Sequence, residues 1–322
     1  MKSLVRVTAA ALAACAAMGA FTAPAGAKAP TRTARHRAAA HRRHSHVAAA
    51  PGAANAYLPL PVTPGSAYLA LGDSVSFGYQ EPQVVPAPDY LNAASFPNYP
   101  QMVADDLHLT VANLACPGET TSSFIDTSAI SNGCENTLGN TSESYRLSYP
   151  LHYSYSGSQL SAALAYLEST PKVRLVSLMI GANDVFVCQE TTSDDCSSTS
   201  ELLGVAATIA KNVRTILSAI RTQADYTGQI AIVNYYSLDY ANSEDNTQSQ
   251  LGDAVLDLAA APYHVEIADG YGQFEAASTD SADDPCTAGL LTQLGTPGTC
   301  GVHPSYAGHA VLAQAVLDAI TN

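Results

Sequence analysis

Four short segments of this sequence carry side chains of the types that acyl-transfer chemistry uses. Ser74, in Gly72-Asp73-Ser74, offers a hydroxyl, and His303 offers an imidazole that can take a proton from it. Gly118 and Asn183 can donate hydrogen bonds, one from the backbone and one from a side-chain amide, to an oxygen that gains negative charge. Each alone is a weak signal, since an Asn after a strand is more often a turn or cap and a lone His before a helix more often a surface residue.

The pattern of apolar residues predicts the elements that must position these groups. Short apolar runs typical of buried strands lie at 67–71, 109–114, 173–180, 230–235 and 265–268. Helical spacing predicts helices at 97–108, 158–169, 200–222, 248–260 and 304–320. Strands that alternate with helices predict one domain, a three-layer α/β/α sandwich around a central parallel sheet of roughly five strands.

The chemical segments fall where such a sheet binds its ligands, at the carboxyl ends of the strands. Ser74 follows the first predicted strand, Gly118 the second and Asn183 the third, while His303 precedes the last helix. We therefore expect the four segments to meet at one rim of the sheet. Their conjunction, in this order and at these ends, is a much stronger signal than any one of them.

These segments resemble the four blocks of the SGNH hydrolases, also called the GDSL esterase and lipase family. The similar segments here are Gly72-Asp73-Ser74, Gly118, Gly181 to Asp184, and His303-Pro304 with Gly308-His309. One position departs from the family pattern, because Val75 stands where the family carries Leu. The resemblance covers about residues 66–320, and it implies a flavodoxin-like fold.

The resemblance also implies a mechanism. Ser74 would be the nucleophile, and His303 would take its proton and return it to the leaving alkoxide. The oxyanion hole would consist of the N–H groups of Ser74 and Gly118 and the side-chain amide of Asn183. The chain would then be a secreted serine esterase or lipase that cleaves carboxylic esters through an acyl-enzyme on Ser74, with neither a cofactor nor a metal.

A second departure concerns the group that orients the imidazole. Members of the family commonly carry Asp three residues before the His, and here that position is Cys300. Some relatives work as a Ser-His dyad in which a backbone carbonyl holds the ring. We favour this reading, with the Cys300 carbonyl accepting from Nδ1–H of His303. The competing hypothesis is that Asp269, Asp283 or Asp284 serves instead.

The cysteines indicate an oxidising compartment. Cys15 would leave with an N-terminal signal peptide, and the six that remain form an even number, as expected of disulfides in an exported chain. Pairing sequence neighbours predicts the bridges Cys116–Cys134, Cys188–Cys196 and Cys286–Cys300. Each would close a polar loop that hydrophobic burial cannot hold, and would contribute about 2–4 kcal/mol. A zinc site is the alternative, but no C-x₂-C spacing is present.

The N-terminus predicts export. Residues 1–27 have a basic start, an Ala-rich apolar stretch and a small-x-small cleavage site, as in a secretory signal peptide. A lipoprotein anchor at Cys15 is the less favoured alternative. Residues 28–57 are rich in His, Arg and Ala without periodicity, so we expect a disordered segment before a catalytic domain over 58–322. This basic segment is a candidate tether to anionic cell-wall polymer or to the acidic body, a candidate His-rich metal site, or a linker without further function.

Charge limits the partners of the body. From Tyr57 onward six basic residues face 28 acidic ones, a net charge of −22 within a whole-chain charge of −14. Such a body repels nucleic acid and anionic membrane surfaces. No run of 18 apolar residues follows the N-terminus, so we expect no stable membrane insertion. We expect a monomer that acts on a small-molecule or lipid ester.

The substrate is the least determined part of the hypothesis. Loops at 81–96 and 117–157 flank the predicted site, and their tyrosines could form an acyl pocket or stack on a sugar; they are Tyr90, Tyr145, Tyr149, Tyr153 and Tyr155. Ordinary packing of these tyrosines on the body is the plainer reading. Three functions remain as alternatives to an esterase or lipase: an acyltransferase, a carbohydrate acetylesterase, and a catalytically silent binding module.

Overall fold

The computed structural model describes residues 59–320 of the chain. The predicted signal peptide and the predicted disordered segment both lie outside these residues. The predictions for the domain from residue 58 onward can therefore be compared with the structure, whereas those for the N-terminal segments stay predictions.

Five parallel strands form the central sheet, in the order β2-β1-β3-β4-β5. The strands are β1 (Ala67–Gly72), β2 (Thr110–Asn113), β3 (Val173–Met179), β4 (Gln229–Val233) and β5 (Glu266–Ala268). This is the flavodoxin-like order, and it confirms the predicted fold class. The order reverses between β1 and β3, and the crevice at such a reversal is where these folds bind ligands.

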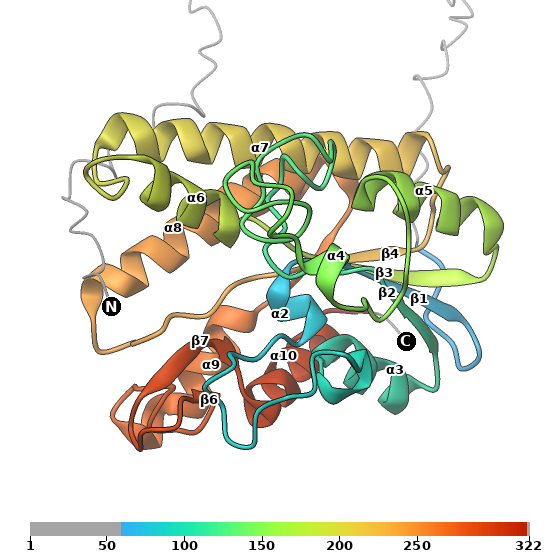
Figure 1. Ribbon diagram of the computed structural model, residues 1–322. Helices are drawn as coiled ribbons and strands as arrows, with labels where there is room; N and C mark the ends of the chain where they lie inside the picture. The colour runs from blue at the N-terminus through green and yellow to red at the C-terminus, as the bar shows by residue number, and fades with distance from the viewer. Residues whose placement is uncertain (1–58, 321–322) are drawn as a thin grey trace, which may run out of the picture. The chain divides into compact units, whose positions relative to one another are not determined.

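Helices cover both faces of the sheet (Figure 1). One face packs against α5 (Gln159–Ser169), α7 (Thr199–Thr222) and α8 (Ser243–Ala260). The other packs against α3 (Tyr99–Leu107), α9 (Gly270–Ser278) and α10 (Tyr306–Ala319). Because both faces are covered, the strands are nearly continuous apolar runs, and this made them readable from the sequence.

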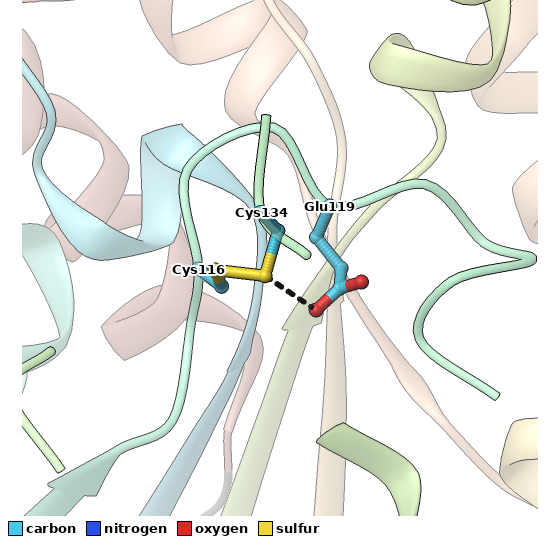
Figure 2. A group of neighbouring side chains, drawn as sticks. All are labelled: Cys116, Glu119 and Cys134. Atoms are coloured by element: carbon cyan, nitrogen blue, oxygen red, sulfur yellow. Dashed lines mark hydrogen bonds between the residues drawn. A yellow bond between two sulfur atoms is a disulfide. The ribbon is translucent and has the colours of Figure 1, made fainter. Parts of the chain in front are cut away.

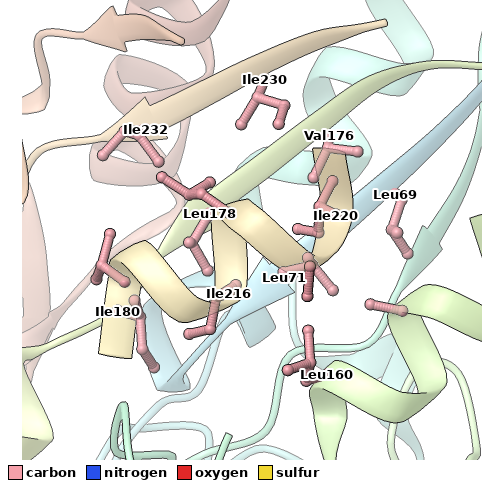
Figure 3. Close-up of a cluster of buried hydrophobic side chains, with 14 of the residues drawn as sticks. Leu69, Leu71, Leu160, Val176, Leu178, Ile180, Ile216, Ile220, Ile230 and Ile232 are labelled. Atoms are coloured by element: carbon pink, nitrogen blue, oxygen red, sulfur yellow. The ribbon is translucent and has the colours of Figure 1, made fainter. Parts of the chain in front are cut away.

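One helix in the described part of the chain, α7, is long and apolar enough to cross a bilayer by length and composition alone. Its apolar stripe, however, packs on the sheet: Ile216 and Ile220 lie against Leu71 and Val176 in the core (Figure 3). The opposite face of α7 carries exposed polar residues such as Lys211, Arg214 and Thr215. An amphipathic core helix explains this segment.

Several elements were not predicted. They are the helices α2 (Ser74–Phe77), α4 (Tyr145–Ser148), α6 (Ala182–Thr191) and α9 (Gly270–Ser278), the strands β6 (Leu291–Gln293) and β7 (Cys300–Pro304), and three 3₁₀ turns at Ala93–Ser95, Ala261–Tyr263 and Thr279–Ser281. β6 and β7 pair antiparallel outside the main sheet. The helix predicted from 304 begins only at Tyr306, because Ser305 caps it by accepting from the N–H of Gly308. His303 lies before this helix, on β7.

All three predicted disulfides are present. They join Cys116 to Cys134, Cys188 to Cys196 and Cys286 to Cys300. The first closes the loop after β2, the second links the end of α6 to the segment before α7, and the third braces the hairpin that carries His303. Three disulfides are consistent with an extracellular protein.

Candidate active site

Ser74 stands at the N-terminus of α2, directly beyond the carboxyl end of β1. Asp73 caps this short helix by accepting from the N–H of Val75 at 2.9 Å. Gly72 must be glycine here, since its φ is 138° and a Cβ would lie 2.2 Å from the carbonyl oxygen of Met179 on β3. The tight contact between two neighbouring strands thus fixes where the hydroxyl of Ser74 emerges.

Three side chains form a continuous hydrogen-bonded chain at this point. The Oγ of Ser74 lies 2.9 Å from Nε2 of His303, across 229 residues of sequence. Nδ1 of the same ring lies 2.8 Å from Oε1 of Glu81. The predicted meeting of the Ser and His segments is therefore present, with a carboxylate behind the imidazole that the sequence analysis did not identify.

Four contacts hold the Glu81 carboxylate in place. Besides the ring of His303, it accepts from the hydroxyl of Thr292 at 2.5 Å, from the N–H of Val302 at 3.0 Å and from the N–H of His303 at 3.4 Å. Gly301 makes room for it, because a Cβ there would lie 2.0 Å from Oε1 of Glu81. The β6–β7 hairpin therefore carries His303 and also holds the carboxylate that contacts it.

Electrostatics keep Glu81 ionised. Burial of the carboxyl opposes ionisation, but the hydrogen bond from His303, the charge of that ring and the hydroxyl of Thr292 outweigh it and lower the pKa of Glu81 to about 2. An anion beside Nδ1 favours the tautomer that leaves Nε2 free to accept a proton from Ser74.

The prediction that the Cys300 carbonyl orients the imidazole is wrong, because Nδ1 of His303 is directed at Glu81. The acidic alternatives serve elsewhere. Asp269 caps α9, Asp284 accepts from the N–H of Cys286, and Asp283 lies in the turn before it. Glu81 was missed because it contacts His303 across 222 residues, and the only local signal is that it is the first acid after Ser74.

The two other predicted segments meet on the opposite side of Ser74. Gly118 adopts φ +83°, and a Cβ there would lie 2.2 Å from the carbonyl oxygen of Asn132. Asn183 is buried in the first turn of α6, with Nδ2 3.4 Å from Oδ2 of Asp73. Asn132 joins the two: its N–H donates to the Gly118 carbonyl at 2.7 Å and its side chain to Oδ1 of Asn183 at 2.9 Å.

Buried carboxyl groups brace this side. Asp73 accepts a hydrogen bond from the hydroxyl of Tyr235, on the segment after β4. Burial raises the pKa of Asp73 to about 6, although the hydrogen bond from Tyr235 lowers it. Asp184 accepts from the N–H and hydroxyl of Thr121, and burial raises its pKa to about 6 as well. The first contact ties β1 to β4, and the second ties α6 to the loop that carries Gly118.

A third carboxyl group lies beneath that loop (Figure 2). Glu119 is fully buried beside the Cys116–Cys134 bridge and accepts from the side-chain amide of Gln159 at 2.9 Å. Burial raises its pKa well above the ordinary value. The side chains of Cys116, Glu119 and Cys134 lie close enough to one another to hold a metal ion, but the two sulfur atoms are joined in a disulfide. The group therefore acts as a packed support for the loop.

A cavity of about 460 Å³ opens beside Ser74 and His303. Its apolar wall comes from α6, α7, α8 and the segment after β4: Val185, Phe186, Ile209, Leu238 and Leu256. Its acidic members are Asp73, Glu190, Asp195, Asp245 and Asp253, and no Lys or Arg of the described chain lines it. The cavity can therefore hold an apolar group and disfavours an anionic one.

The five tyrosines predicted to flank the site do not line this cavity. Tyr90, Tyr145 and Tyr149 pack against one another, with ring centroids 5.1–5.3 Å apart along the series. Tyr79, which the sequence analysis did not single out, joins this cluster and meets the ring of His303 at 5.0 Å. The cluster thus packs against His303 through the ring of Tyr79.

The remaining two tyrosines are structural. Tyr153 packs edge-on against Tyr166 of α5, and Tyr155 lies under the guanidinium of Arg146 at 4.3 Å. The plainer reading of these residues, packing on the body, describes both. The cavity was missed because its apolar residues are spread over four elements, each of which also carries core residues.

Comparisons with known proteins place the chain in a family. No curated protein sequence matches it. Solved structures with a similar fold include an acetylxylan esterase from Geobacillus stearothermophilus (17% identity, 80% of this chain and 95% of that one, TM-score 0.46). They also include phospholipase A1 from Streptomyces albidoflavus NA297 (17%, 79% and 99%, 0.47).

The family itself follows from the sequence. The model of the GDSL-like lipase/acylhydrolase family matches residues 70–311, which is most of the chain and includes all three residues of the hydrogen-bonded chain at Ser74. This confirms the resemblance drawn from the four sequence blocks. The chain belongs to the GDSL-like lipase/acylhydrolase family, the SGNH hydrolases.

Proposed function

We propose that this protein is a secreted esterase or lipase that hydrolyses carboxylic esters through an acyl-enzyme on Ser74. The observation that carries the proposal is the chain Ser74–His303–Glu81, with donor–acceptor distances of 2.9 and 2.8 Å. A serine hydroxyl is a weak nucleophile unless a base takes its proton, and the base must be held in the correct tautomer. Both requirements are met here.

The reaction follows from these positions. Nε2 of His303 takes the Ser74 proton as Oγ attacks the ester carbonyl, and the ionised Glu81 stabilises the imidazolium that forms. The carbonyl oxygen becomes an oxyanion, which accepts from the N–H groups of Ser74 and Gly118 and from the amide of Asn183. His303 then returns the proton to the leaving alkoxide. Water, activated by the same imidazole, releases the acid and restores Ser74.

The free donors support this assignment of the oxyanion hole. In the described part of the chain, neither the N–H of Ser74 nor that of Gly118 is bonded to another protein group. Asn183 uses Oδ1 to accept from Asn132 and directs Nδ2 toward Asp73, which leaves one amide hydrogen available. Three donors that follow three strand ends are thus available to an oxyanion next to Oγ, which supports the proposal.

The cavity favours a substrate with an apolar acyl group. Each buried methylene contributes about 0.8 kcal/mol, so binding strengthens with chain length until the cavity is full. The acidic lining favours a neutral or zwitterionic ester over an anionic one. An acetyl group alone would leave most of the apolar wall uncovered, which argues against a dedicated acetylesterase.

The test is hydrolysis of p-nitrophenyl esters from acetyl to palmitoyl, with Ser74→Ala as the inactive control and an organophosphonate to label Ser74. We expect kcat/KM to rise with chain length and the label to be found on Ser74. A wild-type protein that neither hydrolyses these esters nor reacts with the phosphonate is a binding module, and the proposal fails. Transfer of the acyl group to an added alcohol in preference to water would identify an acyltransferase.

A pair of glycines allows the role of the cavity to be tested separately. Gly252 of α8 lines the cavity, and nothing lies within 4 Å of a Cβ added there. Gly204 of α7 is equally open but does not line it. Gly252→Leu should lower activity on long-chain esters and spare acetyl esters, whereas Gly204→Leu should change neither. Equal loss on both ester classes in Gly252→Leu would contradict an acyl-binding cavity.

The secreted state of the proposal is supported by the three disulfides and by the predicted signal peptide. To test this, the full chain is expressed in a bacterium that has the general secretion pathway. The mass of the protein recovered from the medium then gives its mature N-terminus. We expect a mature N-terminus near Lys28. A lipidated N-terminus at Cys15 retained in the cell fraction would favour the lipoprotein alternative.

A further inference from the structure

Asn132 is the one residue of the described chain that forms hydrogen bonds with both Gly118 and Asn183. Its N–H donates to the carbonyl of Gly118 at 2.7 Å, and its side-chain Nδ2 donates to Oδ1 of Asn183 at 2.9 Å. Gly118 and Asn132 both lie in the long loop between β2 and α4, and Asn183 lies in the first turn of α6. Neither the family blocks nor the predicted site includes Asn132.

The contact with Asn183 decides which way that amide faces. A carboxamide has one accepting and one donating end, and only the donating end can stabilise an oxyanion. With Asn132 donating to Oδ1, Nδ2 must face Asp73 and Ser74. A flipped amide would set two NH₂ groups against each other and aim Oδ1 at the oxygen of Asp73, so both neighbours oppose the flip.

Asn132 can impose this orientation because its own position is fixed. On one side, Ser131 donates its hydroxyl to the carbonyl of Asn136 at 2.6 Å, and on the other Gly133 donates its N–H to the same carbonyl at 2.8 Å. The Cys116–Cys134 bridge closes the loop around them. The backbone of Gly118 lies so close to Asn132 that no side chain fits between them.

We propose that Asn132 is a positioning residue of the oxyanion hole, which orients the amide of Asn183 and holds the peptide of Gly118 beside it. This inference rests on the proposed esterase function, because it assigns a role within the same transition state. Asn132 itself does not touch the substrate in this assignment. The effect of its side chain on the reaction passes through Asn183, whereas its backbone N–H holds Gly118.

Asn132→Asp is the sharpest test, because it keeps the shape of the side chain and replaces the donor by an acceptor. We expect kcat for p-nitrophenyl butyrate to fall about 10²-fold while KM changes by no more than about twofold, as for loss of one oxyanion donor. Protonation of the introduced carboxyl group restores a donor, so the activity of the variant relative to wild type should rise as the pH falls. A merely structural role would not produce this pH-dependent recovery.

A double-mutant cycle provides the second measurement. If Asn132 acts through Asn183, Asn132→Ala should lower kcat in the wild-type background and have only a few-fold effect in the Asn183→Ala background. Asn140→Asp, in the exposed turn that follows, is the matched control and should keep wild-type activity. Thermal unfolding of each variant checks that the domain is folded.

Three results would overturn the inference. They are a wild-type kcat in Asn132→Asp, a relative activity of that variant that does not change with pH, and independent effects of the two alanine substitutions. If the wild-type protein shows neither ester hydrolysis nor phosphonate labelling of Ser74, the proposed function fails and this role fails with it. If wild type is active and only the Asn132 results are negative, the proposed function stands alone.

Discussion

The two sides of Ser74 are built in different ways. On the side of the proposed oxyanion hole, Gly118 and Asn183 follow directly from β2 and β3, two strands of the parallel sheet. On the basic side, His303 lies on the β6–β7 hairpin outside that sheet, and Glu81 lies in an irregular segment after α2. A disulfide braces each side, Cys116–Cys134 on the first and Cys286–Cys300 on the second.

The difference shows what the topology of the sheet determines and what it leaves open. Parallel strands must bring their carboxyl ends to one edge, so the oxyanion side is largely a product of the fold. The basic side depends on contacts across more than 200 residues of sequence, made by a hairpin and a loop. We therefore expect substitutions on the basic side to act through the one chain Ser74–His303–Glu81, and those on the oxyanion side to act on the network that Asn132 forms with Gly118 and Asn183.

The largest effect is expected on the basic side. His303→Ala removes the group that takes and returns the proton, and should lower kcat by about 10⁴-fold or more. Hydrolysis of p-nitrophenyl butyrate under saturating conditions measures it. His108→Asn, at the end of α3, is the control and should leave kcat unchanged. A residual rate close to that of wild type would remove His303 from the mechanism.

The next largest effect distinguishes Glu81 from the three Asp residues that the sequence offered as partners of His303. Glu81→Gln loses the anion that holds the imidazole and should lower kcat by about 10³–10⁴-fold. Because the pKa of Glu81 is about 2, its carboxyl stays ionised throughout the usual assay range and should add no step to the pH–rate profile. Asp269→Asn, Asp283→Asn and Asp284→Asn should each retain activity. Complete loss in one of these three would falsify the assignment of Glu81.

On the oxyanion side the expected loss is smaller. Asn183→Ala removes one of three proposed donors and should lower kcat by about 10²–10³-fold with little change in KM. Steady-state kinetics on one short-chain ester separates the two constants. A large rise in KM with an unchanged kcat would mean that Asn183 binds the ground state and does not act on the oxyanion.

A still smaller effect tests how Glu81 is held. Gly301→Ala places a Cβ 2.0 Å from Oε1 of Glu81 and must displace the carboxylate, which should cost about 10²-fold in kcat/KM. In the Glu81→Gln background the same substitution should add little, because the positioned anion is already gone. Gly204→Ala, where space is open, is the control. An equal loss in both backgrounds would place the effect of Gly301 elsewhere.

The smallest effect concerns stability. Burial raises the pKa of Asp253 to about 8, although the N–H of Tyr235 opposes this. The native state then binds a proton that the unfolded state releases near pH 4, so the free energy of unfolding falls as pH rises from about 4 to 8. Asp253→Asn should make this decline shallower in urea unfolding at several pH values, whereas the exposed Asp105→Asn should not. An unchanged slope would show that Asp253 ionises normally in the native state.

The sequence determined the sheet side of the site better than the hairpin side, for physical reasons. Strands such as 173–180 are apolar throughout, and the residues after them need no long-range information to be placed. The pairing of Cys286 with Cys300 was also readable, because it closes a short loop. The contact of Glu81 with His303 was not, since no pattern of spacing connects a residue before the second strand with one after the fifth.

The cavity was unreadable for a related reason. Ile209 and Leu256 fit the apolar faces of α7 and α8 equally well as core residues, and both belong to the core as well as to the cavity wall. Their spacing along the sequence does not show that the folded elements leave a cavity beside Ser74. The loop tyrosines, by contrast, are conspicuous in the sequence but do not line the cavity. Three of them pack against one another, and the other two pack against Tyr166 and Arg146.

The three bridges are all local, with sequence separations of 18, 8 and 14 residues, and none encloses or crosses another. Short closures lose little chain entropy, so each cysteine meets its proper partner more often than any other. A polypeptide that enters an oxidising compartment from its N-terminus can thus lock its crosslinks one after another, without waiting for distant parts of the chain. Oxidative maturation of this protein should therefore proceed in the order of translocation and depend little on a disulfide isomerase.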